Sequence, residues 1–258
     1  MISIFIALLL NINTMHFTIN SQADSVFYYM KNRIVKIENF SCRLQRIQIF
    51  KDFKRVSSGQ VDYVRNSGIR YRYSSPKYLI CRVNSQILSV DLTSMKAVKL
   101  SEDSLSIEES RSIDPLGAFF SLSKFTMVCM GSSDDLLYFR SQSSQEGRYS
   151  IIIDRKSANI GLMEHFDDAG RIDEQIRYYF KDETIPSQII IRSSLDGSVL
   201  VDSIVLSKIK INDSRVVDII KFPENIKIIE PSNAALPRFL REKGASEMKR
   251  WPDSLQSR

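Results

Sequence analysis

The hydrophobic pattern of the chain changes once near its start, from a helical period to a strand period. Between Ser25 and Asn39, apolar residues recur mostly at spacings of three and four, which predicts one amphipathic helix. Its apolar stripe consists of Val26, Phe27, Met30, Ile34 and Ile37. After Phe40 the period is two, which is typical of half-buried strands. We therefore expect one helix that packs its stripe against a larger β-rich body.

Short alternating segments joined by turn residues predict an antiparallel meander. The clearest alternating segments are Val61–Arg65, Ile69–Tyr73 and Leu88–Leu92. Turn signals occur at Ser58-Gly59, Asn66-Ser67-Gly68, Glu146-Gly147, Asp168-Ala169-Gly170 and Asp196-Gly197. Regular strands with short turns favour one sheet that closes toward a barrel, and we expect residues 24–230 to form this domain.

The strand pattern is interrupted once, between Leu100 and Leu122. Within this stretch, Asp114-Pro115 is a helix start signal that places proline at the first helical position. A short and very apolar helix is expected to follow, carried by Leu116, Phe119, Phe120 and Leu122. Strands are expected again from residue 126 to about residue 229.

The two ends of the chain differ from this body. Ile2–Leu10 is an apolar run, and Ser21 and Ala23 suit the −3 and −1 positions of signal peptidase, so residues 1–23 are expected to be a signal peptide. A run this short does not span a hydrocarbon core of about 30 Å. No Lys or Arg precedes the run, so a buried N-terminal segment is the alternative. Residues 231–258 are basic around a lone Trp251 and are expected to form a loosely attached tail or a short helix.

The formal net charge of +6 and the pI of about 9.2 favour an anionic partner, whether membrane surface, nucleic acid or acidic protein. One segment, Ile69–Tyr73, interleaves basic residues with aromatic ones. Alternation places Arg70 and Arg72 on one face and the aromatic rings on the other. A nucleic-acid stacking platform needs exposed rings beside the charge, so we expect no nucleic-acid partner.

The residues that could carry chemistry are few. Only His16 and His165 are present, and His16 lies in the segment that we expect to be removed. Glu164–Asp168 contains metal-ligand residue types, but it runs into a turn, and alternation sends neighbouring side chains to opposite faces. The sequence contains no P-loop, GxSxG or GxGxxG motif. We therefore expect a protein that is not an enzyme, with no catalytic residues, no metal and no cofactor.

The three cysteines, Cys42, Cys81 and Cys129, are widely spaced. They form no CxxC motif and no Cys/His metal spacing. One disulfide in an oxidising compartment and three thiols packed as small hydrophobic groups remain as alternatives.

Three sequence blocks occur in an order and spacing that resemble a known family. The blocks are Phe40–Gln45, then Gly59–Arg65 with Ile69–Pro76 and Ile87–Asp91, then Ile211-Asn212 with Phe222-Pro223. Over residues 25–230 they resemble the periplasmic outer-membrane lipoprotein carrier proteins, the LolA-like lipoprotein chaperones. Asn66 stands where the family has proline, and Tyr71 stands where it has tryptophan.

The resemblance implies a mainly β fold with a few helices: a strongly curved antiparallel sheet that forms an unclosed half-barrel lidded by helices. Such a protein is a periplasmic monomer that binds the acyl chains of lipoproteins in an apolar cavity. It carries them from an inner-membrane release complex to an outer-membrane acceptor and contacts membrane surfaces transiently. The alternatives are a lipid- or glycolipid-binding envelope protein with a different ligand, an envelope-stress sensing module, and a barrel filled by its own side chains.

The residues expected to bind the ligand lie on the strand faces and on the short helix. The walls are expected to be Val61, Tyr63, Ile69, Tyr71, Tyr73, Leu88 and Val90, and the lid Leu116, Phe119 and Phe120. The resemblance assigns to Arg65 the inward-facing arginine whose hydrogen bonds hold the lid. Arg65 shares strand parity with Val61 and Tyr63, and an arginine on an apolar face needs partners such as lid carbonyls. The alternative is that the strand has already ended and Arg65 points to solvent.

Overall fold

The structure, a computed structural model, describes residues 21–51, 53–101, 113–142, 148–181, 184–195, 198–214, 220–224 and 226–229. Most of the expected signal peptide, the expected tail at 231–258 and the expected turns at 146–147 and 196–197 lie outside the described residues. The expected cleavage point after Ala23 falls in the first turn of helix α2 (Ser21–Val35).

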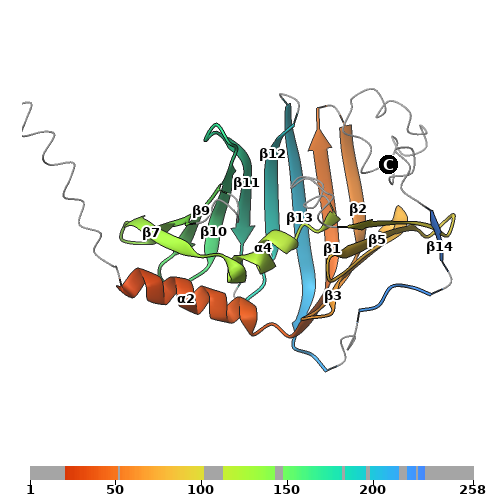
Figure 1. Ribbon diagram of the computed structural model, residues 1–258, viewed down its shortest axis with the longest axis horizontal. Helices are drawn as coiled ribbons and strands as arrows, with labels where there is room; N and C mark the ends of the chain where they lie inside the picture. Colours follow the sequence, from red (N-terminus) through yellow and green to blue (C-terminus); the bar gives the residue numbers. More distant parts are fainter. Residues whose placement is uncertain are drawn as a thin grey trace, which may run out of the picture.

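Fourteen described strands form one sheet, in the order β14-β6-β5-β4-β3-β2-β1-β13-β12-β11-β10-β9-β8-β7 (Figure 1). The strands of the first half are β1 (Asn39–Phe50), β2 (Phe53–Val64), β3 (Gly68–Ser75), β4 (Lys77–Val83), β5 (Gln86–Asp91) and β6 (Lys96–Ser101). Those of the second half are β7 (Met127–Ser132), β8 (Leu136–Ser141), β9 (Arg148–Asp154), β10 (Ile160–Phe166), β11 (Ile172–Tyr179), β12 (Gln188–Leu195) and β13 (Ser198–Ile211). The last strand is β14 (Lys227–Ile229).

The sheet consists of two meanders that meet at β1 and β13 and run outward from there. All neighbouring strands pair antiparallel except β14, which lies parallel to β6. The outermost strands β14 and β7 do not pair with each other, so the sheet is unclosed. The prediction of a mainly β, unclosed antiparallel sheet with helices is confirmed.

Helix α2, with α4 (Gly117–Ser121) and η2 (Leu122–Lys124), covers one face of the curved sheet, which we call the concave face (Figure 1). The helix ends at Val35, earlier than the expected Asn39, and the predicted stripe is its buried side: Met30 and Ile34 are 3% and 4% exposed, and Ile37, 1% exposed, lies just beyond the helix. Each such side chain contributes about 1.5–3 kcal/mol when it leaves water. No helix in the described part of the chain is long and apolar enough to cross a membrane.

The predicted turn at Ser58-Gly59 is wrong, because both residues lie inside β2. The register with β3 shifts between them, which marks a β-bulge. A Cβ atom on Gly59 would lie 2.3 Å from the carbonyl oxygen of Arg72. The glycine therefore serves the close approach of two strands. The turns at Asn66-Ser67-Gly68 and Asp168-Ala169-Gly170 are confirmed.

The predicted apolar helix is present, and we call residues 113–124 the lid segment. Helix α4 begins at Gly117, two residues later than Asp114-Pro115 predicted, with Leu116 as the N-cap. The side chain of Asp114 does not cap the helix, because its carboxylate binds groups of the sheet instead. The residues before 113 lie outside the described residues.

Candidate functional site

Four of the predicted wall residues lie together and fully buried on the concave face. Val61, Ile69, Tyr71 and Tyr73 are each at most 1% exposed. The register of β2 with β3 places Val61 opposite Tyr71, and Tyr63 opposite Ile69. Tyr63 is half-buried and packs against the same core.

Leu88 and Val90 lie on the other face of the sheet, so the structure does not bring them to the predicted wall. Tyr71 pairs with Ile80, which pairs with Ser89, so Ser89 faces the concave side. The face opposite carries a separate core of Leu79, Cys81, Leu88, Val90 and Ala97, with Phe222 and Ile226 packed against it. The concave positions that the sequence analysis missed in this region are Ile80, Ile87, Val98 and Leu100.

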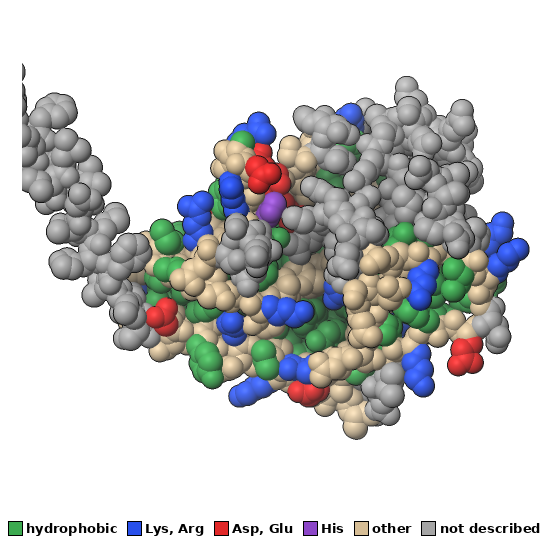
Figure 2. Space-filling model, in the orientation of Figure 1, with side chains coloured by type: hydrophobic (Ala, Val, Ile, Leu, Met, Phe, Trp, Pro, Cys, Tyr) green, Lys and Arg blue, Asp and Glu red, His purple; other side chains and the backbone are tan. Residues whose placement is uncertain are grey.

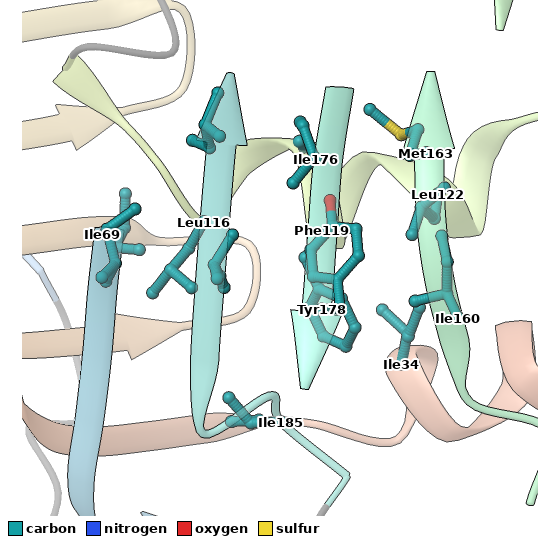
Figure 3. Packing of buried hydrophobic residues seen from close by; sticks show 14 of the residues in the cluster. Ile34, Ile69, Leu116, Phe119, Leu122, Ile160, Met163, Ile176, Tyr178 and Ile185 are labelled. Atoms are coloured by element: carbon teal, nitrogen blue, oxygen red, sulfur yellow. The ribbon is translucent and has the colours of Figure 1, made fainter. Parts of the chain in front are cut away.

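The lid segment fills the hollow of the sheet with apolar side chains (Figure 3). Leu116 and Leu122 are 0% exposed and Phe119 is 2% exposed. The ring of Phe119 lies 5.9 Å from that of Tyr178, and the ring of Phe120 stacks on Tyr63 at 4.4 Å. A helix of five residues is not stable in water by itself, so its position depends on these contacts.

Three polar side chains, which we call the Asp114 cluster, fasten the lid segment to the sheet. Tyr71 donates its hydroxyl hydrogen to Oδ1 of Asp114. Arg82 forms an ion pair with Oδ2 of the same carboxylate at 2.8 Å, and the Asp114 side chain is only 2% exposed. A Cβ atom on Gly117 would lie 2.8 Å from that oxygen, so the glycine lets the carboxylate pack against α4.

The ionisation state of Tyr71 agrees with its role as a donor in this cluster. Burial raises the pKa of the Tyr71 hydroxyl well above the ordinary tyrosine value, and the nearby Asp114 carboxylate raises this pKa further. The hydroxyl therefore stays protonated and donates a hydrogen bond to the carboxylate. Its oxygen also accepts a hydrogen bond of 3.4 Å from the backbone nitrogen of Leu116, so both ends of the hydroxyl bind the lid segment.

Arg65 fastens the other helix. Its Nε and Nη2 donate to the carbonyl oxygen of Ile37 at 3.1 and 2.9 Å, and Nη2 also donates to Ile34 at 3.3 Å. Ile34 lies in the last turn of α2 and Ile37 lies two residues beyond the helix, so Arg65 binds both the end of α2 and the segment that leaves it. Glu38 lies 3.5 Å from Nε of Arg65. Arg65 therefore turns inward rather than to solvent, and the segment that it holds is the end of α2.

A pocket of about 730 Å³ opens at the mouth of the half-barrel, between the end of α2, the lid segment and the turns β2–β3 and β4–β5. Its apolar wall includes the rings of Tyr63, Phe120 and Tyr149, and its charged lining is Arg65, Arg82, Asp114 and Lys124. In Figure 2 the face that carries α2 and α4 is hollowed near its centre, with hydrophobic side chains inside and basic side chains beside the hollow.

A second polar network on the concave face, away from this pocket, was not predicted. Arg46 binds Asp202 through two nitrogens, and both side chains are at most 5% exposed. Gln48 donates to Asp202 at 3.2 Å, and Arg46 donates to the Tyr73 hydroxyl at 3.4 Å. Strand alternation could have indicated that Arg46 is buried, because it lies on the same face of β1 as the buried Phe40. A buried pair of this kind satisfies its own charges and leaves this end of the hollow polar.

In the candidate metal segment Glu164–Asp168, Glu164 and His165 lie on opposite faces of β10, and Asp167 and Asp168 lie beyond its end. His165 contacts Asp173 through Nδ1 at 2.6 Å, whereas Glu164 accepts from Ser150 and Gln175. Across the described ranges, no group of three or more His, Cys, Asp or Glu side chains could hold a metal ion.

The three cysteines are free thiols in the structure. Cys42 and Cys81 are buried in the cores of opposite faces, and Cys129 is half-buried. Burial raises the pKa of Cys81 to about 11. Because the thiolate is the reactive form, we expect a thiol reagent at pH 8 to modify Cys129 fast and the other two only on unfolding. Counting released chromophore before and after adding denaturant tests this; three fast equivalents would contradict the burial.

The fold is shared with several solved structures. A LolA superfamily protein from Nitrosomonas europaea superposes with a TM-score of 0.54 at 15% identity, covering 74% of this chain and 94% of that one. A DUF1329 family protein from Desulfovibrio piger superposes with a TM-score of 0.61 at 11% identity, covering 77% of this chain and 94% of that one. A putative outer membrane lipoprotein-sorting protein domain from Vibrio parahaemolyticus superposes with a TM-score of 0.52 at 8% identity, covering 74% of this chain and 94% of that one.

At the level of sequence, no protein-family model and no curated protein matches the chain. The similarity to the solved structures is therefore one of fold: the chain has the fold of LolA superfamily and DUF1329 family proteins.

Proposed function

We propose that this chain is a non-enzymatic carrier of the cell envelope that binds the acyl chains of a lipoprotein against the concave face of its sheet. It would move the lipoprotein through the periplasm, from an inner-membrane release complex to an outer-membrane acceptor. The observation that carries the proposal is the lid segment, whose Leu116, Phe119 and Leu122 occupy an apolar hollow that acyl chains could fill in their place. The fold shared with a LolA superfamily protein supports it.

The energetics of the lid segment suit a carrier, which has to release what it binds. An acyl chain gains about 0.8 kcal/mol for each methylene that it buries. The same surface is covered by the lid segment in the unloaded protein, and about 1.5–3 kcal/mol is lost for each large apolar side chain that must leave it. The affinity is the difference of these two quantities, so it stays moderate and the lid segment assists release.

The direct test is extraction of a triacylated lipoprotein from inner-membrane vesicles by the purified protein. We expect the lipoprotein to appear in the supernatant in complex with the protein. Arg65→Leu removes the hydrogen bonds to the end of α2, each worth about 1.5–3 kcal/mol for a charged donor. The unloaded form, in which the helices cover the concave face, is therefore less stable. This variant should retain the lipoprotein longer when acceptor vesicles are added.

The matched control is Arg43→Leu, at an exposed position of β1. It should behave as the unsubstituted protein does. Failure of the unsubstituted protein to extract any lipoprotein would count against the proposed function, and equal retention by both variants would count against the role of Arg65.

A lipid or glycolipid is the second candidate ligand, and the pocket at the mouth favours it. The head of a lipoprotein ligand continues into a polypeptide, whereas the lining here combines aromatic rings with Arg65, Arg82 and Lys124 around an open pocket of about 730 Å³. A polar lipid head fits such a space, since ligand pockets are commonly about 300–1,000 Å³. Mass spectrometry of lipids that co-purify with the protein separates the two ligands.

A further inference from the structure

The pocket at the mouth carries an excess of positive charge. Its lining includes three cationic side chains, Arg65, Arg82 and Lys124, and one anionic side chain, Asp114. Arg82 already neutralises Asp114 across 2.8 Å. Glu38, near Arg65, is 66% exposed at the rim, where solvent screens its charge. Positive charge within a concave surface concentrates anions there.

Two of the cations are held in place before any ligand arrives. Arg65 is fixed by the carbonyl groups at the end of α2, through Nε and Nη2. Within the described part of the chain its Nη1 makes no hydrogen bond, so one donor group is left over. Arg82 is fixed by Asp114. Preorganised donors of this kind bind an anion at a lower entropic cost than mobile side chains do.

Lys124 differs from the two arginines because it has no structural task. It is exposed at the end of η2, and it makes no hydrogen bond or ion pair with any described residue. A lysine ammonium is a compact charge on a flexible stem, which suits it to close over an anion from the open side. Lys124 is therefore the cation that can be removed without loosening either helix.

The apolar wall of the pocket joins it to the lid segment. Tyr63 of the sheet and Phe120 of α4 line the pocket, stack at 4.4 Å and also pack against the concave core. An acyl chain that displaced Phe120 would pass from the pocket into the hollow. The charged group of the same molecule would then remain beside Arg65, Arg82 and Lys124.

We infer that this pocket receives a phosphate group, the anionic head of the acyl-chain ligand. The inference rests on the second proposed ligand, a lipid, because the acylated cysteine of a lipoprotein carries no phosphate, and it names the head-group chemistry that the mouth selects. Phosphate suits the site because arginine pairs with its oxygens in a planar fork and lysine binds it as a point charge. The source of the phosphate is a lipid head rather than free phosphate, because the apolar wall adjoins the charged lining.

The test compares two ligands with the same twelve-carbon chain, measured by isothermal titration below their critical micelle concentrations at pH 8. Dodecyl phosphate carries the anionic head, and dodecyldimethylamine oxide carries an uncharged polar head. We expect dodecyl phosphate to bind about tenfold more tightly, the effect of one charge-assisted hydrogen bond. Lys124→Gln should abolish most of that preference and leave the binding of the amine oxide unchanged. Lys54→Gln, at an exposed position of β2 outside the pocket, should change neither.

The outcomes separate the inference from the function on which it rests. Equal affinity for both ligands, or a preference that survives Lys124→Gln, would overturn the phosphate inference and leave acyl binding standing. Binding of neither ligand would overturn both. Inorganic phosphate is titrated alone as the third arm. If it bound as tightly as dodecyl phosphate, the site would be one for free phosphate and the lipid-head assignment would be wrong.

Discussion

Replacing Asp114 with alanine should lower the free energy of unfolding by about 3 kcal/mol, the cost of removing one partner from a buried ion pair. The substitution leaves the Tyr71 hydroxyl and the Arg82 guanidinium without their acceptor, and the Asp114 side chain is almost fully buried. This loss of stability lies at the lower end of the range for such pairs, because the Arg82 side chain is 23% exposed and can turn toward water. Equilibrium unfolding in urea measures it.

Two further variants divide this effect between its parts. Tyr71→Phe removes only the hydroxyl and should cost about 1.5 kcal/mol, the lower end of the range for a hydrogen bond to a charged group. Asp114→Asn keeps an acceptor for Tyr71 but loses the charge that faces Arg82, so its cost should lie between the other two. The control is Asp135→Ala, whose ion pair with Lys156 is at the surface and should contribute less than about 1 kcal/mol. If Asp114→Ala were no more destabilising than this control, the Asp114 cluster would not hold the lid segment.

The sequence predicted correctly those strands in which one face is buried and the other is exposed to solvent. In β3 the two faces differ clearly, since Tyr71 is buried and Arg72 is exposed, so alternation gave the correct concave residues. In β5 both faces are buried, because a segment from beyond residue 220 covers the outer one. Period alone cannot assign a face in such a strand, and Leu88 and Val90 were placed wrongly for that reason.

The errors at Ser58-Gly59 and Asp114 have a common physical cause. Glycine and aspartate are turn and cap residues in local context, but each can also serve a contact with a distant part of the chain. Gly59 admits the carbonyl group of Arg72, and Asp114 binds Tyr71 of β3. Such contacts depend on the tertiary fold, which a local pattern does not contain. Arg65 lies just beyond the end of β2 at Val64, so strand parity does not explain its direction; it turns inward, as the family resemblance implied, but it binds the end of α2 rather than the lid segment.

The pocket at the mouth could be predicted only in part. Tyr63, Arg65 and Phe120 were among the expected site residues, and all three line it. Arg82 and Lys124 were missed, since each is one basic residue among many in a chain of net charge +6. What distinguishes them is their position around one space, which arises when the turn β4–β5 and the end of the lid segment meet.

Phe119→Ala should change stability and ligand affinity in opposite directions. Its ring is 2% exposed and packs on Tyr178 and Phe180, so its loss should lower the free energy of unfolding by about 3–5 kcal/mol. In the proposed carrier the same contacts must break before acyl chains enter the hollow. Removing them lowers the cost of opening, so the affinity for a twelve-carbon acyl ligand should rise by about tenfold for each 1.4 kcal/mol saved.

Phe139→Ala separates this effect from destabilisation in general. Phe139 is 1% exposed and stacks on Phe27 of α2 at 5.1 Å, outside the lid segment, so its loss should cost a similar amount of stability. It should leave acyl affinity unchanged, because α4 still has to be displaced as before. Urea unfolding and isothermal titration of both variants, well below their melting temperatures, give the comparison. Parallel changes in affinity would show that general loosening controls entry, whereas a rise confined to Phe119→Ala identifies α4 as the element that competes with the ligand for the concave face.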